Sequence, residues 1–192
     1  RLSENNQEAI CAAVLAGKGT GYASRDALAL VFVPALLEQV GIEFALGLIN
    51  AALSAERMAQ LAEKYGDAWG LELDDYNRLS AANKEAVCEE ILDGQPYTDV
   101  DVVLQALESA VEDALEEQAL EAINAATAEK MGEVIIMYAD VFGLDLEDYD
   151  ALDGDGKDSV HAAMVDKDFQ TGSAVKDAFD SAVEDAQGAG GS

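Results

Sequence analysis

The stretch that decides the fold is INAALSAERM at residues 49–58, because it returns as INAATAEKM at residues 123–131. A second pair follows it, LELDDYNRLSAANKEAV at 71–87 and LDLEDYDALDGDGKDSV at 144–160. The isoleucines that open the first pair lie 74 residues apart (123 − 49 = 74). Self-similarity at one period indicates a structural unit that is copied along the chain.

The N-terminal segment matches the second half of that unit, since RLSENNQEAICAAVL at 1–15 aligns with RLSAANKEAVCEEIL at 78–92. We therefore expect a trailing half repeat at residues 1–48, full repeats at 49–122 and 123–187, and a flexible tail at 188–192. The chain begins without Met and closes on GAGGS, which predicts a segment of a longer protein.

The composition favours helices. Half of the residues are hydrophobic, few are aromatic, and Ala, Leu, Glu and Asp are abundant. We predict an all-α protein, an array of helical repeats of about 70 residues packed as a helical bundle or solenoid. In the first full repeat, helices are expected at 55–65, 81–92 and 99–125, with a short turn at 74–76. The expected N-cap residues are Ser3, Ser54, Ser80, Thr98 and Thr127. The expected apolar stripe of the long helix is Val103, Leu104, Leu107, Val111, Ala114 and Leu115.

The charge limits the partners. Eleven Lys and Arg against 39 Asp and Glu give a formal net charge of −28, which repels phosphate backbones and anionic membrane surfaces. The most apolar stretch, residues 28–48, is interrupted by Pro34, Glu38 and Glu43, so we do not expect it to cross a membrane. Nucleic acid and membrane insertion are thus excluded, and the expected partner is a protein or a second copy of the chain.

No catalytic set is predicted. Cys11 and Cys88 stand at equivalent repeat positions, where the last copy has His161, so we expect these side chains to fill similar core niches. A single His cannot assemble a Ser-His-Asp, Cys-His or zinc-ligand set. Carboxylates could imitate the acid and base pair of a hydrolase, but they recur at matching positions of a short connector: Asp74, Asp75, Glu147 and Asp148. We interpret that connector as a turn above the packed rings of Tyr76 and Tyr149, and we expect no enzymatic activity.

One acidic segment resembles a calcium loop. If Gly156 of DGDG takes position 6 of an EF-hand loop, Asp153 and Asp155 fall at positions 3 and 5, but Ala151 and Ala162 stand at positions 1 and 12. The frame lacks two ligands, and the repeat alignment explains the segment as a helix N-terminus. No cofactor is therefore expected apart from weakly bound calcium, and its candidate ligands are Asp150, Asp153, Asp155 and Asp158.

A candidate interface comes from comparing the half repeat with the first full repeat. Four polar residues of the full repeat, Gln105, Glu108, Glu116 and Gln118, are replaced by apolar ones. The apolar replacements are Val31, Pro34, Ile42 and Phe44. This face is predicted to pack against a neighbouring segment of the same chain, or to be a docking surface for another protein or a symmetry mate.

The recurring residues also suggest a family. The pattern INAA, Met, GLDL, a DYNAL-like turn and a Lys-containing Ala-rich helix resembles Ala-rich helical repeats of large bacterial surface proteins of the S-layer type. It also resembles repeats of phage structural proteins such as head fibres and decoration proteins. In this sequence it is carried by Ile49, Asn50, Met58, Leu71, Leu73, Tyr76, Leu79 and Lys84, and by Ile123, Asn124, Met131, Leu144, Leu146, Tyr149, Leu152 and Lys157.

The resemblance implies a non-enzymatic structural or interaction module of a surface-exposed bacterial protein, located outside the cell. The alternative is a phage virion decoration or head-fibre protein that forms oligomers. A third alternative, from the acidic segment at residues 150–158, is a weak calcium-dependent binding module.

Overall fold

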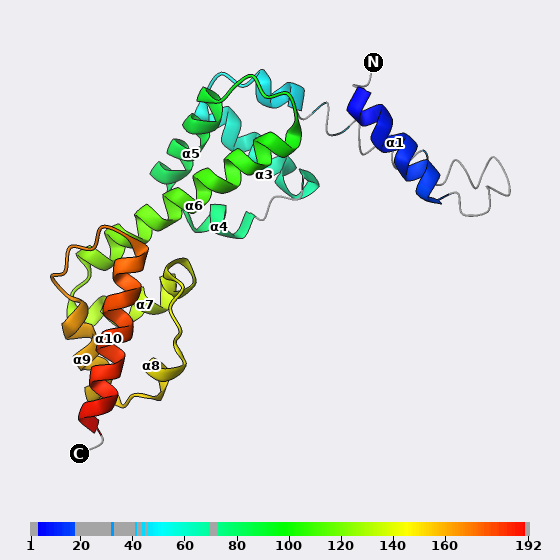
Figure 1. The fold of residues 1–192 in the computed structure, drawn as a ribbon. Helices are drawn as coiled ribbons and strands as arrows, with labels where there is room; N and C mark the ends of the chain where they lie inside the picture. The colour runs from blue at the N-terminus through cyan, green and yellow to red at the C-terminus, as the bar shows by residue number, and fades with distance from the viewer. Residues whose placement is uncertain are drawn as a thin grey trace. The chain divides into compact units, whose positions relative to one another are not determined.

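The computed structural model describes residues 4–17, 46–69 and 73–190, together with the single positions 32, 41 and 44. These residues form α-helices, and no β-strand occurs among them (Figure 1). The prediction of an all-α protein is therefore confirmed. The chain divides into two compact units, one of residues 1–74 with 84–109 and the other of residues 75–83 with 110–192.

The first unit contains α1 (Glu4–Gly17), α3 (Ala55–Trp69), most of α5 (Ala81–Asp93) and the beginning of α6 (Val100–Ala125). On α3, Met58, Leu61 and Ala62 are buried at three- and four-residue spacings, which is the period of an amphipathic helix. The sequence places the end of this helix at 65, but it runs on to Trp69, because an internal glycine such as Gly66 is tolerated in a helix.

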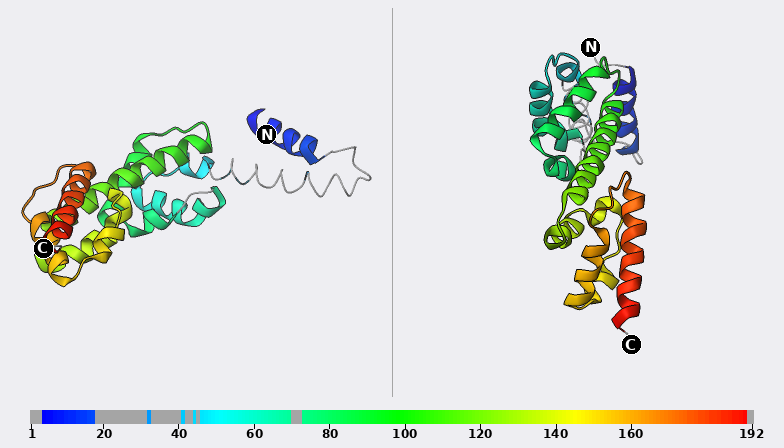
Figure 2. Two further views of the ribbon diagram at one scale, coloured as in Figure 1. Left: turned by 60° about the horizontal axis from the view of Figure 1, so that its bottom comes forward. Right: turned by 90° about the vertical axis from the view of Figure 1, so that its left-hand side faces the viewer.

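The second unit contains most of α4 (Leu73–Arg78), the end of α6, and four further helices: α7 (Ala128–Phe142), α8 (Glu147–Ala151), α9 (Gly154–Met164) and α10 (Gly172–Gly190). Here α9 packs against α7 and α10, and α10 also packs against α7 (Figure 2). Its core side chains include Met131, Ile135, Val160, Met164, Val175 and Phe179.

The expected helices of residues 49–122 are confirmed as α3, α4, α5 and α6. Of the expected stripe on α6, the side chains of Val103, Leu107, Val111 and Leu115 are buried. The expected packing of two tyrosines is also confirmed, since Tyr76 and Tyr149 are buried. Gly143 ends α7 in the left-handed conformation, with φ of 62°, and its amide bonds the carbonyl oxygen of Asp140.

The N-caps follow the prediction in part. The Oγ atoms of Ser54 and Ser80 each accept a hydrogen bond from an amide of the first turn, at 3.2 Å. Thr127 precedes α7 but makes no side-chain cap bond. The prediction of Thr98 as a cap is wrong, because α6 begins at Val100 and Asp99 Oδ1 accepts the bond from the amide of Asp101. Ser3 lies outside the described residues.

The order of helices occurs twice. A 15-residue helix, a short helix, a medium helix and a long helix follow one another as α3 to α6 and again as α7 to α10. The two long helices also correspond in sequence, because ESAVEDA at 108–114 of α6 matches DSAVEDA at 180–186 of α10. α10 continues beyond residue 187, where the sequence placed the end of the repeat.

One asparagine in each copy makes the same pair of hydrogen bonds to the connector before the long helix. In the first unit, Asn50 Nδ2 donates to the Tyr97 carbonyl at 2.8 Å, and the Tyr97 amide donates back to Asn50 Oδ1 at 2.8 Å. In the second unit, Asn124 and Phe169 make the same two bonds at 2.8 and 2.7 Å. We call each pair the Asn clamp. It satisfies both backbone groups of a residue that has no helical partner.

Candidate functional site

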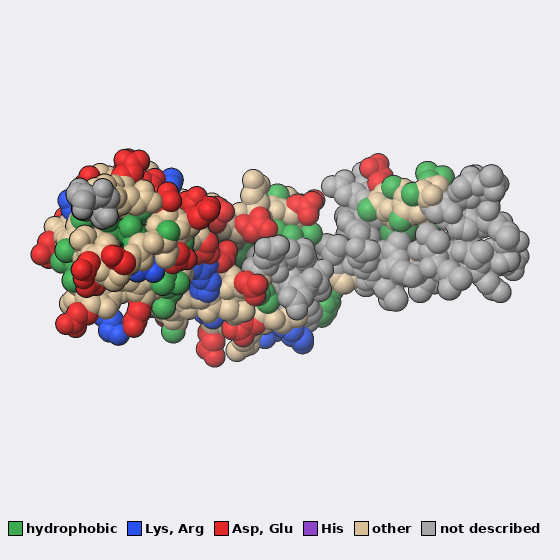
Figure 3. Space-filling model, turned by 90° about the horizontal axis from the view of Figure 1, so that it is seen from below, with side chains coloured by type: hydrophobic (Ala, Val, Ile, Leu, Met, Phe, Trp, Pro, Cys, Tyr) green, Lys and Arg blue, Asp and Glu red, His purple; other side chains and the backbone are tan. Residues whose placement is uncertain are grey.

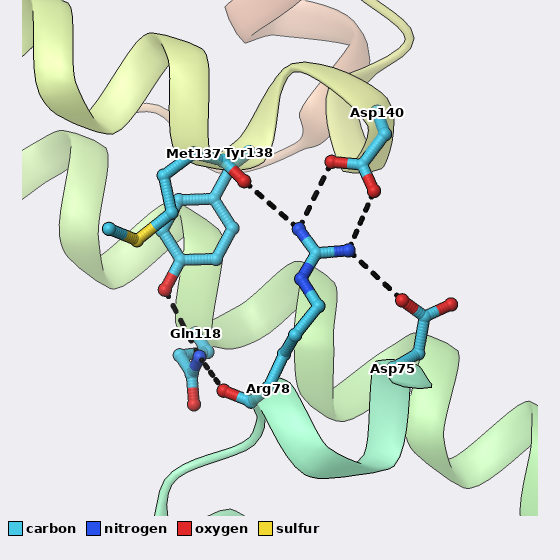
Figure 4. Close-up of polar contacts among 6 residues, drawn as sticks. All are labelled: Asp75, Arg78, Gln118, Met137, Tyr138 and Asp140. Carbon is cyan, nitrogen blue, oxygen red and sulfur yellow. Dashed lines mark hydrogen bonds and ion pairs between the residues drawn. The ribbon is translucent and has the colours of Figure 1, made fainter. Parts of the chain in front are cut away.

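The largest group of polar contacts in the second unit surrounds Arg78, the last residue of α4 (Figure 4). Its guanidinium reaches α7, where Nη2 lies 3.0 Å from Asp140 Oδ1 and Nη1 lies 2.6 Å from Asp140 Oδ2. Nη1 also donates to Asp75 Oδ1 at 3.0 Å, and Nη2 donates to the Met137 carbonyl at 3.0 Å. This two-point pairing uses the planar fork of arginine, which a lysine could not reproduce.

Gln118 of α6 extends this cluster on the other side of Arg78. Its Nε2 donates to the Arg78 carbonyl and to the Tyr138 hydroxyl, both at 3.1 Å. Its Oε1 accepts from the Ser80 amide at 2.7 Å and from Asn83 Nδ2 at 3.3 Å. One amide side chain therefore ties the end of α4 and the start of α5 to α6 and α7.

The electrostatics of the Arg78 cluster are those of a structural contact. The hydrogen bond from Arg78 lowers the pKa of the Asp140 carboxyl, although partial burial opposes this effect. The same bond raises the pKa of Arg78. The Arg78 side chain is 29% exposed and that of Asp140 is 66% exposed, so water screens the pair. The cluster holds α4, α6 and α7 in register, and its single guanidinium is already paired with two carboxylates, Asp75 and Asp140.

The carboxylates of the two short connectors lie at the surface. Asp75 pairs with Arg78, whereas Asp74, Glu147 and Asp148 are exposed. Asp145, just before α8, accepts the Glu147 amide at 3.0 Å and so shapes the beginning of that helix. The interpretation of LELDDY and LDLEDY as turns above packed tyrosine rings thus agrees with the described contacts.

The four candidate calcium ligands have other neighbours. Asp153 caps α9, because its Oδ1 accepts the Gly156 amide at 2.8 Å. Asp150 lies 3.8 Å from Lys157 Nζ, and Asp158 lies 4.0 Å from His161 Nδ1. Asp155 is exposed in the first turn of α9. Within the described ranges, no three His, Cys, Asp or Glu side chains are close enough together to hold a metal ion.

The cysteine positions differ between copies. Cys88 is buried as expected, but Cys11 is exposed, so the prediction of a core niche is wrong for Cys11. The corresponding His161 is half-buried, and its Nε2 lies 2.8 Å from the Tyr149 hydroxyl. Burial lowers the pKa of His161, with Asp158 opposing this shift. Burial also raises the pKa of Tyr149.

Of the four candidate interface residues, Phe44 alone is described, and 61% of it is exposed. Val31, Pro34 and Ile42 lie outside the described residues. On the face that Figure 3 draws, acidic side chains are spread over the described residues, as the net charge of −28 predicts, and apolar side chains lie between them.

Comparison of the chain with protein-family models, curated proteins and solved structures finds no significant match. Among the helices that the structure describes, none combines the length and the apolar character that a bilayer crossing requires. Sequence reasoning missed both the Arg78 cluster and the Asn clamps. The recurrence of Asn in INAA was a signal for the clamps, whereas Arg78 matches Arg1 of the half repeat but is replaced by Ala151 in the last copy, so it gave no consistent signal.

Proposed function

We propose that this chain is a non-enzymatic structural and interaction module, built from copies of one four-helix repeat. The observation that carries the proposal is the repeated helix order with an Asn clamp at the same place in each copy. In repeat proteins in general, copies of one unit stack on their neighbours and form an extended surface for contacts.

The roles of the recurring polar residues support a scaffold. Asn50 and Asn124 bind backbone groups, and Ser80 and Asp153 cap corresponding helices. Residues that recur because they hold helix ends together need no ligand to explain them. The strongly acidic surface agrees with a module that is kept soluble by repulsion.

We further propose that the module belongs to a surface-exposed bacterial protein, on the strength of the resemblance to S-layer-type repeats. Its partner is a second copy of the chain or another protein, and the contact lies at the apolar face that includes the exposed Phe44. A virion decoration protein would use the same kind of contact. Labelling of intact cells with an antibody against residues 123–187 distinguishes the two locations, because only a protein on the cell surface would be labelled.

The contact is tested by light scattering coupled to size exclusion, over a range of protein concentrations. We expect the chain to self-associate, and we expect Phe44→Gln to shift the equilibrium toward the monomer. The matched control is Leu53→Gln, because Leu53 is 94% exposed but lies outside the candidate face. Equal behaviour of the two variants would contradict the assignment of the face. Runs with calcium and with a chelator show whether the acidic segment at 150–158 contributes.

A further inference from the structure

The first helix has the sequence of a repeat helix but a different environment. RLSENNQEAICAAVLAG at 1–17 matches RLSAANKEAVCEEILDG at 78–94, so α1 corresponds to α5 and, in the last copy, to α9. Cys88 of α5 is fully buried, whereas its counterpart Cys11 of α1 is exposed. Leu15, one turn further along α1, is 65% exposed, whereas its counterpart Leu92 is half-buried.

The second unit shows which residues cover the corresponding face of α9. His161, at the position of Cys11 and Cys88, bonds the Tyr149 hydroxyl of α8 at 2.8 Å. On the neighbouring α7, a Cβ atom placed on Gly132 would lie 2.9 Å from the His161 ring. The first two helices of the repeat therefore cover the position, with a small residue on one helix and a tyrosine on the other.

The residues at these two repeat positions differ together between the copies. Large His161 faces Gly132, which has no side chain. The first copy has the smaller Cys88, and the residue that corresponds to Gly132 is Ala59 of α3 (132 − 59 = 73, and Met131 matches Met58 at the same spacing). Cys11 has the size of Cys88, so its complement is a helix with Ala at that position. A glycine there would leave a void beside the thiol.

We propose that the Cys11 and Leu15 face of α1 is the docking surface for a helix pair of the α3–α4 type, whose Ala covers Cys11 and whose Tyr closes the site as Tyr149 does in α8. This inference rests on the proposed repeat function and names its partner. The occupant has the sequence character of residues 49–77, and the contact gives Cys11 the burial that Cys88 already has.

The test uses the reaction of Cys11 with a thiol reagent such as DTNB. In the native chain, Cys11 should react fast and the buried Cys88 slowly. The chain is then extended at Arg1 with a second copy of residues 49–77, because residues 1–3 already match residues 78–80. We expect Cys11 to react at least about tenfold more slowly in the extended chain, because burial of a leucine-sized side chain favours docking by that factor or more. The matched control carries Leu in place of Ala59 in the added copy, and its Cys11 should react as in the native chain.

Three results would overturn the proposal. The first is that Cys11 reacts as fast in the extended chain as in the native chain. This result counts against docking whether or not circular dichroism shows added helix, because docking should also make the extension helical. Another is equal protection by the Ala and Leu extensions, which indicates unspecific shielding. The last is concentration-dependent protection in the unextended chain, which assigns the face to a second copy instead. Self-association through Phe44 is measured separately, so failure here leaves the proposed function standing.

Discussion

Replacing Gly132 with alanine should destabilise the second unit, although the same change stabilises most helices. In the interior of a helix, Ala is favoured over Gly by about 0.8–1.0 kcal/mol. At Gly132, however, the new Cβ would lie 2.9 Å from Cε1 and Nε2 of His161 and 3.3 Å from the Tyr149 hydroxyl. Overpacking of this kind costs about 1–3 kcal/mol. If the ring moves away, its bond to Tyr149 is lost, at about 1 kcal/mol. We expect Gly132→Ala to lower the free energy of unfolding by about 1–2 kcal/mol.

A double-mutant cycle isolates this contact. With His161→Cys in the background, the pair becomes Ala and Cys, as at Ala59 and Cys88 of the first copy. There Gly132→Ala should stabilise by about 1 kcal/mol, so the coupling between the sites should be about 2–3 kcal/mol. Urea denaturation followed by circular dichroism measures all four proteins. Gly188→Ala is the control, since no atom lies within 4 Å of a Cβ at that helical glycine. A coupling below about 0.5 kcal/mol would refute the reasoning.

The other contacts give three further predictions. Asn124→Ala should lower the free energy of unfolding by about 2–4 kcal/mol in urea denaturation, because it leaves the Phe169 amide and carbonyl unpaired. The control is Asn77→Ala at an exposed position, which should lower it by less than about 0.5 kcal/mol. Arg78→Met should cost about 1–2 kcal/mol at neutral pH. Because Arg78 lowers the pKa of Asp140, this contribution exists above pH ~4 and should disappear as acid protonates Asp140, so a cost that is independent of pH contradicts the pairing. The lowered pKa of His161 means that the unfolded chain binds its proton first, so stability should fall as the pH drops below about 6.5, and less so in His161→Gln.

Much of the helical structure could be predicted from local patterns. Apolar residues at three- and four-residue spacings, together with Ser54 and Ser80 as caps, placed α3 and α5 close to their observed starts. The misplaced cap at Thr98 has a local cause. Thr and Asp are both good caps, and the sequence does not indicate which of two adjacent candidates precedes the first helical residue.

The long-range polar contacts could not be predicted in this way. Asn50 and Tyr97 lie 47 residues apart, and Arg78 and Asp140 lie 62 residues apart, so no periodicity connects them. The environment of Cys11 was mispredicted for a related reason. Cys11 stands at a repeat position that is buried in the first full copy, but its burial depends on which helices lie beside α1. The sequence of one helix does not show which helices pack against it.

The Asn clamp bonds the backbone of its target, which is Tyr97 in one copy and Phe169 in the other. Three residues, 94–96, separate the end of α5 from the target in the first copy, and four residues, 165–168, separate the end of α9 from it in the second, yet the clamp forms in both. The connector between the third and fourth helices can therefore change length and composition while the long helix still starts from the same anchor. For protein engineering, this makes residues 165–168 a natural place to graft a foreign recognition loop onto the scaffold, whereas Gln95 in the connector 94–96 bonds the Ile49 carbonyl at 2.7 Å.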